Sequence, residues 1–413
     1  MKVLLIGSGG REHALATGLA ADSSVTELHV APGNPGIAEF ATTHPIAVTE
    51  NAKLVELAKS LAIDLVVIGP EIPLVNGLAD EIRKESIPVF GPSKAAAQLE
   101  GSKHFAKGVM RDAGVPTAKS ATCENQSEIE RALDSFGAPY VVKDDGLAAG
   151  KGVVVTEDRE LALKHALSCQ RVVIEEYLSG PEISLFGISD GKRILPMQPA
   201  QDFKRAFDND EGPNTGGMGA YSPLPWAPSN IIEDTYKQVL APMIAEMAAR
   251  GTPFVGLLYA GLAVTDRGIK VIEFNARFGD PETQVLIPRL KTPLAQLLFK
   301  AATGNLAGIE LEWKDESAVT VVLAANGYPA EVKTGDEISN LNPMDGVRIF
   351  HAGTKIDGAL RSSGGRVLTI TGLGANLTEA REKAYRTISQ INLAGSFFRN
   401  DIALNASIAE LGN

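Results

Sequence analysis

Three polar side chains stand at alternate positions in one apolar segment near residue 275. Glu273, Asn275 and Arg277 share one face if the segment is a β-strand, because successive side chains on a strand point to opposite sides. The other face then holds the apolar residues Ile272, Phe274, Ala276 and Phe278. Carboxylate and amide oxygens suit Mg²⁺, and a guanidinium can neutralise a phosphoryl group in transfer. The pattern predicts metal-assisted phosphoryl transfer; the alternative is a solvated strand face with a salt bridge.

A glycine-rich segment over residues 141–153 places Lys143 before a loop and Lys151 inside it. The segment differs from a P-loop because its glycine spacing is one residue short, Gly152 replaces the metal-binding Ser/Thr, and a strand follows where a helix is required. Strand, loop and strand predict a flap whose amides and Lys151 cover phosphates. A hairpin tip that binds no ligand is the alternative.

Three loops near the N-terminus each follow a predicted strand. In the loop over residues 7–13, free amides at a helix start can hold phosphate, and Arg11 adds a bidentate donor. A dinucleotide site is the alternative, but Glu12 occupies the third glycine position of GxGxxG and no acidic ribose ligand ends the second strand. Together with the loops at 32–36 and 69–71, this segment predicts a site for a small phosphorylated sugar.

Two further segments combine acids, amides and glycines. Residues 172–182 read as an apolar strand that ends in Glu175 and Glu176, which could supply hinge groups for adenine and a carboxylate for ribose; a plain edge strand is the alternative. Residues 201–225 predict one long polar loop rich in glycine and proline. A loop of this length is usually functional or disordered, and its basic and amide residues favour anion binding.

Over the first hundred residues, apolar runs alternate with helical patterns. We expect strands over 2–6, 27–30, 64–68 and 88–90. Helices are expected between them, over 11–20, 51–61 and 74–85. This alternation predicts a parallel, doubly wound sheet with ligand loops at the carboxyl ends of its strands.

The rest of the chain no longer follows that alternation. Region 103–190 has a helix, strands and the glycine loop, and region 191–320 has a helix over 231–250 and two long apolar strands. The tail predicts strands over 319–325 and 366–371 and one helix over 377–391. We therefore expect a multidomain α/β and α+β protein.

The bulk composition narrows the class of protein. A length of 413 residues exceeds one ordinary domain of ~100–200 residues, and the formal net charge of -11 argues against a nucleic-acid partner. Cys123 and Cys169 have no ligand spacing, so neither a disulfide framework nor a zinc site is indicated, and a cytoplasmic setting fits. The longest apolar stretch, 254–264, is too short to cross a membrane and reads as a buried strand.

Taken together, the motifs resemble the ATP-grasp superfamily and, within it, the phosphoribosylamine-glycine ligase family. The resemblance runs along essentially the whole chain through the segments GGREHA, APGNPG, VIGPE, DGLAAGKGV, PNTGGMGAYSP and EFNARFGDPETQ. It implies a Rossmann-like N-terminal domain over 1–102, an ATP-grasp domain over 103–320 with a small flap lobe at about 122–190, and a β-rich C-terminal domain over 321–413. Asp144 and Phe203 depart from the pattern, since a small residue and a histidine are frequent there.

The resemblance also implies roles for individual residues. ATP would be held by Lys103, Lys143, Gly146, Gly150, Lys151, Gly152, Glu175, Glu176, Leu178, Glu182 and Lys204. Phosphoribosylamine would meet Gly10, Arg11, Gly33, Asn34 and Glu71. Glycine and its acyl phosphate would meet Asp202, Asn214, Thr215, Gly216, Gly217, Asp280, Pro281 and Glu282. Mg²⁺ or Mn²⁺ would bind Glu273 and Asn275, and the catalytic side chains would be Arg277, Lys143 and Lys151.

The implied reaction activates glycine as glycyl phosphate and couples it to 5-phosphoribosylamine, as a step of purine biosynthesis. Catalysis then consists of positioning and charge stabilisation, with no protein nucleophile. We expect a monomer with small-molecule substrates and no membrane partner. Two alternatives stay open: a ligase of the same superfamily that acts on another acid, and a nucleotide-binding regulator without turnover.

Overall fold

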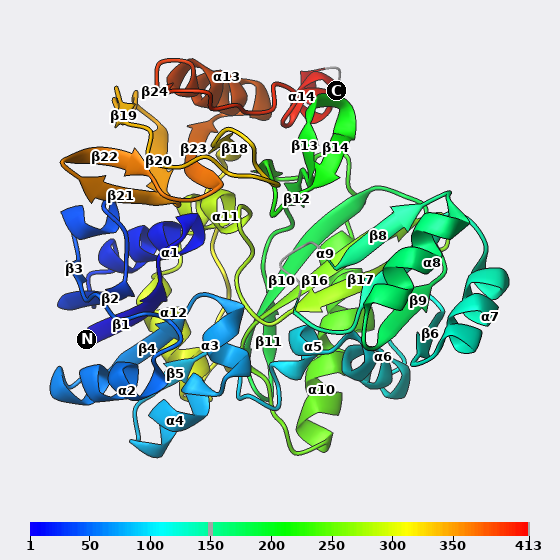
Figure 1. The fold of residues 1–413 in the computed structure, drawn as a ribbon. Helices are drawn as coiled ribbons and strands as arrows, with labels where there is room; N and C mark the ends of the chain where they lie inside the picture. Colours follow the sequence, from blue (N-terminus) through cyan, green and yellow to red (C-terminus); the bar gives the residue numbers. More distant parts are fainter. Residues whose placement is uncertain (148–151, 412–413) are drawn as a thin grey trace.

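The computed structural model describes residues 1–147 and 152–411 (Figure 1). Its N-terminal part is a parallel sheet with the strand order β3-β2-β1-β4-β5, which confirms the predicted doubly wound sheet. The strands are β1 (Lys2–Gly7), β2 (Glu27–Pro32), β3 (Thr42–Thr43), β4 (Leu65–Ile68) and β5 (Val89–Phe90). Because β1 lies between β2 and β4, the loops that follow these three strands meet at one edge, where doubly wound sheets bind ligands.

The helices of this part are α1 (Gly10–Ala20), α2 (Asn51–Ser60), α3 (Glu71–Val75) and α4 (Leu78–Lys84). The prediction of a single helix over 74–85 is therefore wrong. Gly77 has a φ of 88°, a left-handed conformation that glycine adopts without strain, and it separates α3 from α4. This break lets α3 begin at Glu71, directly behind β4.

A small lobe follows the connecting helices α5 (Gln98–Gly101) and α6 (Lys103–Asp112). Its antiparallel sheet has the order β6-β9-β7-β8, made of β6 (Ser120–Cys123), β7 (Tyr140–Asp144), β8 (Val153–Thr156) and β9 (Val172–Glu175). Helices α7 (Gln126–Phe136) and α8 (Arg159–Ser168) pack on it and share a separate small core with it. β7 and β8 pair directly, so the predicted strand, glycine loop and strand are confirmed and a P-loop is excluded.

The large lobe is a second antiparallel sheet, with the order β11-β10-β16-β17. Its strands are β10 (Glu182–Asp190), β11 (Ile194–Pro196), β16 (Val255–Thr265) and β17 (Gly268–Asn275). The predicted helix over 231–250 consists of α9 (Ile231–Thr235), a π-helical segment over Tyr236–Leu240 and α10 (Ala241–Ala249). After β17 come α11 (Thr283–Arg289) and α12 (Leu294–Ala302), which share one hydrophobic core with the N-terminal sheet.

An irregularity in the pairing of β16 with β17 corrects the expected faces of the latter strand. Glu273 pairs with Gly261 and Val271 with Leu262, so Ile272 is the extra residue of a β-bulge. Before the bulge Ile269 and Val271 are buried, whereas after it Phe274, Ala276 and Phe278 are buried. Ile272 is only half-buried and does not belong to the apolar face that alternation assigned to it.

The predicted loop over 201–225 is wrong as well, because this segment contains four short strands. They are β12 (Gln201–Asp202), β13 (Arg205–Phe207), β14 (Glu211–Asn214) and β15 (Gly219–Ser222). β13 and β14 form a hairpin, and β12 and β15 extend a sheet of the C-terminal part. Of these four strands, β15 also pairs with a strand about one hundred residues later in the chain, β18.

The C-terminal part is rich in strands, as predicted. Its main sheet has the order β12-β15-β18-β23-β20, with β18 (Ser317–Ala324), β20 (Val347–His351) and β23 (Arg366–Gly374). Two-stranded sheets are formed by β19 (Ile338–Ser339) with β24 (Asn392–Leu393) and by β21 (Thr354–Asp357) with β22 (Ala359–Ser362), and the helices are α13 (Leu377–Ile388) and α14 (Leu404–Leu411). The exact domain boundaries stay predictions; the one at 320 falls inside β18.

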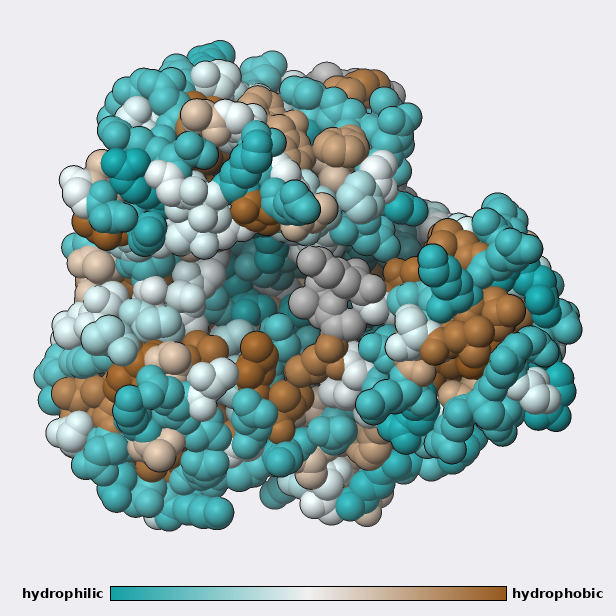
Figure 2. Space-filling view, in the orientation of Figure 1, coloured by the Kyte–Doolittle hydropathy of each residue, from teal (hydrophilic) through white to brown (hydrophobic). Residues whose placement is uncertain are grey.

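The surface is hollowed where the N-terminal part, the C-terminal part and the small lobe meet, and the visible floor of this hollow is hydrophilic (Figure 2). The large lobe shares hydrophobic cores with both the N-terminal and the C-terminal part. Within residues 1–147 and 152–411, no helix has the length and apolar character needed to cross a membrane.

Two glycine substitutions test how tightly these layers pack. A Cβ atom at Gly372 of β23 would lie 2.1 Å from the carbonyl oxygen of Ala380 in α13, whereas a Cβ at Gly108 of α6 would meet nothing within 4 Å. We expect Gly372→Ala to lower stability by about 1–3 kcal/mol through overpacking. We expect Gly108→Ala to raise it by about 0.5–1 kcal/mol, because alanine favours a helix. Urea unfolding midpoints measure both; a stable Gly372→Ala variant would contradict the packing of α13 on β23.

Candidate active site

Arg277 lies just beyond β17 and meets carboxylates from two other segments. Its Nη2 is 3.2 Å from Oε1 of Glu100 in α5, and its Nε is 3.5 Å from Oε2 of Glu71 at the start of α3. Burial lowers the pKa of the guanidinium, but Glu100 and Glu71 outweigh burial and raise the pKa above its ordinary value. Nε is buried and has no hydrogen-bond partner among the described residues, so one donor remains for a ligand.

Arg11 approaches the same point from the first turn of α1. Its Nε is 2.5 Å from Oε1 of Glu12, and its Nη1 donates to the carbonyl oxygen of Phe278 at 3.1 Å. Glu12 also accepts a hydrogen bond from the amide of Gly9 at 2.7 Å. A Cβ atom at Gly7 or Gly69 would lie within 2.3 Å of the Glu12 side chain. These glycines therefore make room for a carboxylate that fixes Arg11.

Gly10, Gly33 and Asn34 serve the framework of the N-terminal loops. A Cβ atom at Gly10 would lie 2.8 Å from Nε2 of Gln284, so this glycine lets α1 approach α11. Gly33 has a φ of 74°. The side-chain Nδ2 of Asn34 donates to the carbonyl oxygens of Ser8 and His351, each at 2.9 Å, which joins the N-terminal loop to β20.

Lys143 connects the small lobe to the large lobe. Its Nζ donates to the carbonyl oxygen of Ile272 at 2.9 Å and lies 2.9 Å from Oε2 of Glu175. The bulge leaves this carbonyl of Ile272 outside the regular pairing of β17. The other carboxylate oxygen of Glu175 lies 3.0 Å from Nζ of Lys107. Burial lowers the pKa of Lys107, and Glu175 opposes this shift.

The base of the glycine loop is fixed on both sides. Lys103 donates to the carbonyl oxygen of Gly146 at 3.0 Å, and the amide of Asp144 donates to the carbonyl oxygen of Gly152 at 2.8 Å. Burial raises the pKa of Cys169, which follows α8, and the nearby carboxylate of Asp144 adds to this shift. The predicted residues Gly150 and Lys151 lie outside the described residues.

The segment that follows β9, here called the hinge, begins at Glu176, whose side chain contacts two other segments. Its Oε1 accepts from the amide of Lys119 at 3.1 Å and lies 3.2 Å from Nζ of Lys270 on β17. Leu178 follows with a half-exposed side chain. The hinge backbone at these residues therefore lies beside Lys143, Glu175 and the edge of β17.

Lys204 forms ion pairs with two acidic residues of the predicted site, Glu182 and Asp202. Its Nζ is 2.9 Å from Oε2 of Glu182 and 3.0 Å from Oδ1 of Asp202. Burial lowers the pKa of Lys204, but Asp202 and Glu182 raise it well above its ordinary value.

Glu282 lies buried in the same neighbourhood and accepts from Oγ of Ser184 at 3.0 Å, while Ser184 also contacts the hydroxyl of Tyr259 at 2.7 Å. Burial, and secondly Asp202, raise the pKa of Glu282. The nearest described partners of this carboxyl group are therefore hydroxyls.

Arg366 of β23 joins the two loops predicted to surround glycine. Its Nη1 donates to the carbonyl oxygens of Gly216 and Asp280, at 2.7 and 2.8 Å, and its Nη2 is 3.2 Å from Oδ2 of Asp280. Burial raises the pKa of Asp280, but Arg366 and then Arg11 outweigh it, so its pKa lies below the ordinary value. Gly217 has a φ of 106°, and a Cβ atom there would lie 2.5 Å from Cδ of Pro281.

The neighbouring residues of this loop have internal partners. Thr215 donates to the carbonyl oxygen of Lys204 at 2.9 Å, and Asn214 pairs with Arg205 at the end of the hairpin β13-β14.

Glu273 and Asn275 provide the oxygen donors expected for a divalent cation. After the bulge both lie on the face of β17 opposite the buried Phe274, and Oδ1 of Asn275 is 3.5 Å from Nη2 of Arg277. Among the described residues, the Glu273 carboxylate has no ion-pair or hydrogen-bond partner. Two hard oxygens that leave most coordination positions to substrate and water match the way Mg²⁺ is bound.

The structure thus brings ten of the predicted residues together in two groups. One contains Lys103, Lys143, Gly146, Glu175 and Glu176; the other contains Arg11, Glu71, Arg277, Asp280 and Glu282. Sequence reasoning missed Lys107, Glu100, Glu12 as a partner of Arg11, and Arg366. Of these residues only Glu12 could have been noticed in the sequence. A carboxylate at the third glycine position of GxGxxG needs a nearby hydrogen-bond or ion-pair partner.

Comparisons with known proteins agree with this geometry. Models of the phosphoribosylglycinamide synthetase N domain, ATP-grasp (A) domain and C domain match residues 1–100, 101–283 and 318–405. The chain belongs to the phosphoribosylglycinamide synthetase family. A phosphoribosylamine–glycine ligase of Streptomyces coelicolor is 60% identical over 98% of this chain and 100% of its own length. One of Mycobacterium tuberculosis is 52% identical over 98% of this chain and 99% of its own.

Solved structures show the same fold. The phosphoribosylamine–glycine ligase of Thermotoga maritima superposes with a TM-score of 0.85 and 34% identity over 98% of this chain and 100% of its own. A biotin carboxylase of Campylobacter jejuni gives a TM-score of 0.74 at 16% identity over 100% of this chain and 95% of its own, which supports the fold alone. The expected family and ATP-grasp architecture are confirmed, while the roles of single residues stay predictions.

The buried triad of Lys143, Glu175 and Lys107 gives a test of stability. Replacing Glu175 by Gln leaves two buried ammonium groups without their counter-charge, so we expect a loss of about 3–5 kcal/mol. Adding Lys107→Met should recover part of this loss, because one unpaired charge is then removed. Denaturant unfolding of the single and double variants measures the coupling; strictly additive losses would contradict the triad.

Proposed function

We propose that this chain joins glycine to 5-phosphoribosylamine at the expense of ATP and forms glycinamide ribonucleotide, ADP and phosphate, a step of de novo purine biosynthesis. The observation that carries the proposal is the position of Arg277. Its guanidinium lies between Glu71, at the start of α3, and Asn275 of β17, and its buried Nε makes no hydrogen bond among the described residues. The names of the relatives, each a phosphoribosylamine–glycine ligase, support the same reaction.

In the first step, a carboxylate oxygen of glycine attacks the γ-phosphorus of ATP and the bond to the β-phosphate oxygen breaks, giving glycyl phosphate and ADP. Lys103 of α6 and Lys143 of the small lobe hold the nucleotide, and the hinge at Glu176 and Leu178 holds its base. Arg277 stabilises the negative charge of the transferred group. A divalent cation at Glu273 and Asn275 would neutralise phosphate charge.

In the second step, the amine of phosphoribosylamine attacks the carbonyl carbon of glycyl phosphate, loses a proton and expels phosphate. Arg11 and the loops of Gly10, Gly33 and Asn34 hold the sugar phosphate, and Glu71 faces the amine. The loop over 214–217, with Asp280 and Glu282, surrounds glycine. Gly150, Gly152 and Lys151 cover the phosphates, which shields the acyl phosphate from water. The enzyme acts as a monomer on these small molecules.

The reaction itself is the direct test. The purified chain is supplied with ATP, Mg²⁺, glycine and freshly made phosphoribosylamine, and glycinamide ribonucleotide is detected by mass spectrometry. We expect product only when all components are present, and ADP in equal amount. Other amino acids and bicarbonate replace glycine in parallel. Product or ADP release that prefers one of these acids would assign the chain a different substrate.

Removing one metal donor tests the second part of the proposal. Glu273→Ala should lower the rate of ADP formation at least 100-fold, because the cation would lose the carboxylate proposed as its ligand. Raising Mg²⁺ or Mn²⁺ should restore part of the rate, and comparing the two ions gives the preference. Glu310→Ala, at an exposed acid outside the site, is the matched control. Full activity of Glu273→Ala at low metal would refute this assignment.

A further inference from the structure

Glu100 is a buried acid beside the candidate active site to which the proposed mechanism gives no role. It lies in α5, a short helix that packs against α3 on one side and against β17 on the other. Its side chain is only 8% exposed. A buried carboxylate is costly unless its oxygens find donors, so the partners of Glu100 show what it holds in place.

The two carboxylate oxygens of Glu100 bind two consecutive residues just beyond β17. Oε2 accepts a hydrogen bond from the backbone amide of Ala276 at 2.8 Å, and Oε1 lies 3.2 Å from Nη2 of Arg277. The pairing of β16 with β17 ends at Asn275, so the amide of Ala276 takes its partner from a side chain. One carboxylate therefore fixes both the main chain before Arg277 and the end of its side chain.

The contacts of the Arg277 guanidinium leave one nitrogen for a ligand. Nη1 donates to the carbonyl oxygen of Phe278 at 3.2 Å, and Nη2 is 3.5 Å from Oδ1 of Asn275 as well as 3.2 Å from Glu100. Nε makes no hydrogen bond among the described residues. A guanidinium is planar, so holding both Nη atoms fixes the direction in which the Nε–H bond points.

Glu71, the other acid near Arg277, holds the guanidinium less closely. Its carboxylate is 3.5 Å from Nε, and its side chain is 26% exposed. Burial raises the pKa of Glu71, but Arg277 and then Arg11 outweigh it, so this pKa lies below its ordinary value. Burial lowers the pKa of Arg277, and among the acids that raise it Glu100 has the largest effect. Glu100 is therefore the main counter-charge of this arginine.

We propose that Glu100 is a positioning residue for phosphoryl transfer, which aims the Nε–H bond of Arg277 at the transferred group and holds the peptide between Asn275 and Arg277. The inference rests on the proposed function, because Glu100 acts through Arg277. A guanidinium that is free to turn loses its alignment with charge that develops only in the transition state. The loss therefore appears in kcat and not in the KM for ATP.

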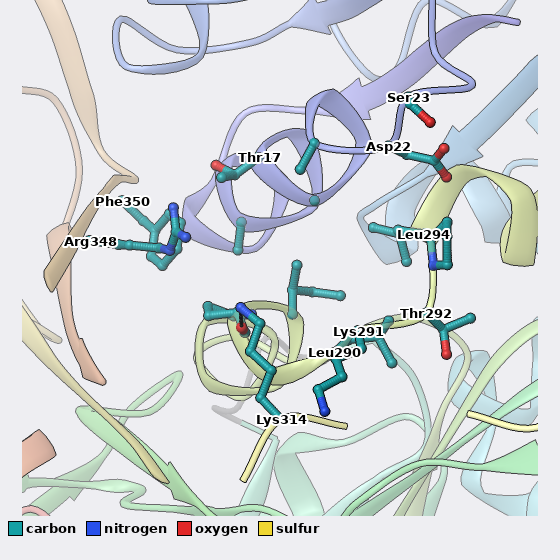
Figure 3. Close-up of a pocket in the computed structure, with 16 residues that line it drawn as sticks. Thr17, Asp22, Ser23, Leu290, Lys291, Thr292, Leu294, Lys314, Arg348 and Phe350 are labelled. Atoms are coloured by element: carbon teal, nitrogen blue, oxygen red, sulfur yellow. Dashed lines mark hydrogen bonds between the residues drawn. The ribbon is translucent and has the colours of Figure 1, made fainter. Parts of the chain in front are cut away.

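Asp22 is an acid with a purely structural version of the same contacts. It follows α1, at the end of that helix opposite to Arg11, and lines a cavity of about 250 Å³ between α1 and α11 (Figure 3). Its buried carboxylate accepts from the backbone amides of Ser24 and Gln296, at 2.9 and 3.1 Å. Like Glu100 it joins two segments, but it contacts no residue of the candidate active site. Asp22→Asn is therefore a matched control.

Steady-state rates of ADP formation with ATP, Mg²⁺, glycine and phosphoribosylamine test the role of Glu100. We expect Glu100→Gln to lower kcat by about tenfold or more. The KM for ATP should change by less than about twofold. Glutamine keeps one oxygen for the amide of Ala276 but offers no negative charge to Arg277. Asp22→Asn should lower the urea unfolding midpoint and leave kcat as in the parent.

A second measurement separates positioning from a merely structural role. If Glu100 acts through Arg277, the double variant Glu100→Gln with Arg277→Gln should be no slower than Arg277→Gln alone, within about twofold. Glu100→Asp keeps the charge on a side chain too short to span both partners, so its kcat should lie between those of the parent and Glu100→Gln. Circular dichroism and urea unfolding check that each variant folds. If Glu100→Gln does not fold, Glu100→Asp carries the test.

Four results would overturn the proposal. They are a parent-like kcat in Glu100→Gln, a parent-like kcat in Glu100→Asp, a raised KM for ATP at unchanged kcat, and a double variant whose loss is the product of the two single losses. Failure of the proposed function is recognised separately, because the parent chain itself would then form no ADP with glycine.

Discussion

The burial of the Arg277 guanidinium constrains most of the structure around it. A charged group taken out of water costs several kcal/mol unless counter-charges lie close by, and here they come from Glu71 and Glu100. Glu71 begins α3, directly after β4 of the N-terminal sheet, and Glu100 belongs to the connection that leads into the small lobe. The end of β17 can therefore hold its cation only when the N-terminal part is docked on the large lobe. The continuous hydrophobic core between the two parts serves that docking.

The bulge at Ile272 in β17 is the second feature that shapes the site. Without it, the alternation that buries Ile269 and Val271 would also bury Glu273 and expose Phe274. One extra residue reverses the faces, so the polar residues turn away from the core and Phe274 enters it. The bulge also leaves the carbonyl oxygen of Ile272 to Lys143, at 2.9 Å, which ties the small lobe to the large one. Because the small lobe has a separate hydrophobic core, this hydrogen bond helps to hold it against the large lobe.

Local patterns predicted the parts of the molecule that depend on local physics. The parallel sheet, the flap strands and the grouping of Glu273, Asn275 and Arg277 follow from alternation within short segments. The bulge could not be predicted, because it is defined by the register with β16. Lys107 was not among the predicted residues, because its partner Glu175, at 3.0 Å, is brought close only by the pairing of β9 in the sheet. β12 and β15 escaped prediction because β15 finds its partner in β18, far along the chain, whereas the hairpin β13-β14 is a local pairing that sequence reasoning missed.

The C-terminal part contributes to the site by holding loops, and Phe203 illustrates how. This residue, where the family often has a histidine, stacks beneath the guanidinium of Arg399 at 4.9 Å, and Arg399 is itself buried and paired with Asp401 and Asp210. An aromatic face suits a buried cation, so the exchange is consistent with the surroundings. The stack fixes the strand on either side of Phe203, where Asp202 and Lys204 form the ion pair that reaches Glu182. Arg366 does the same for Gly216 and Asp280. Both arginines act on backbone geometry, so the C-terminal part shapes the site without supplying its reacting groups.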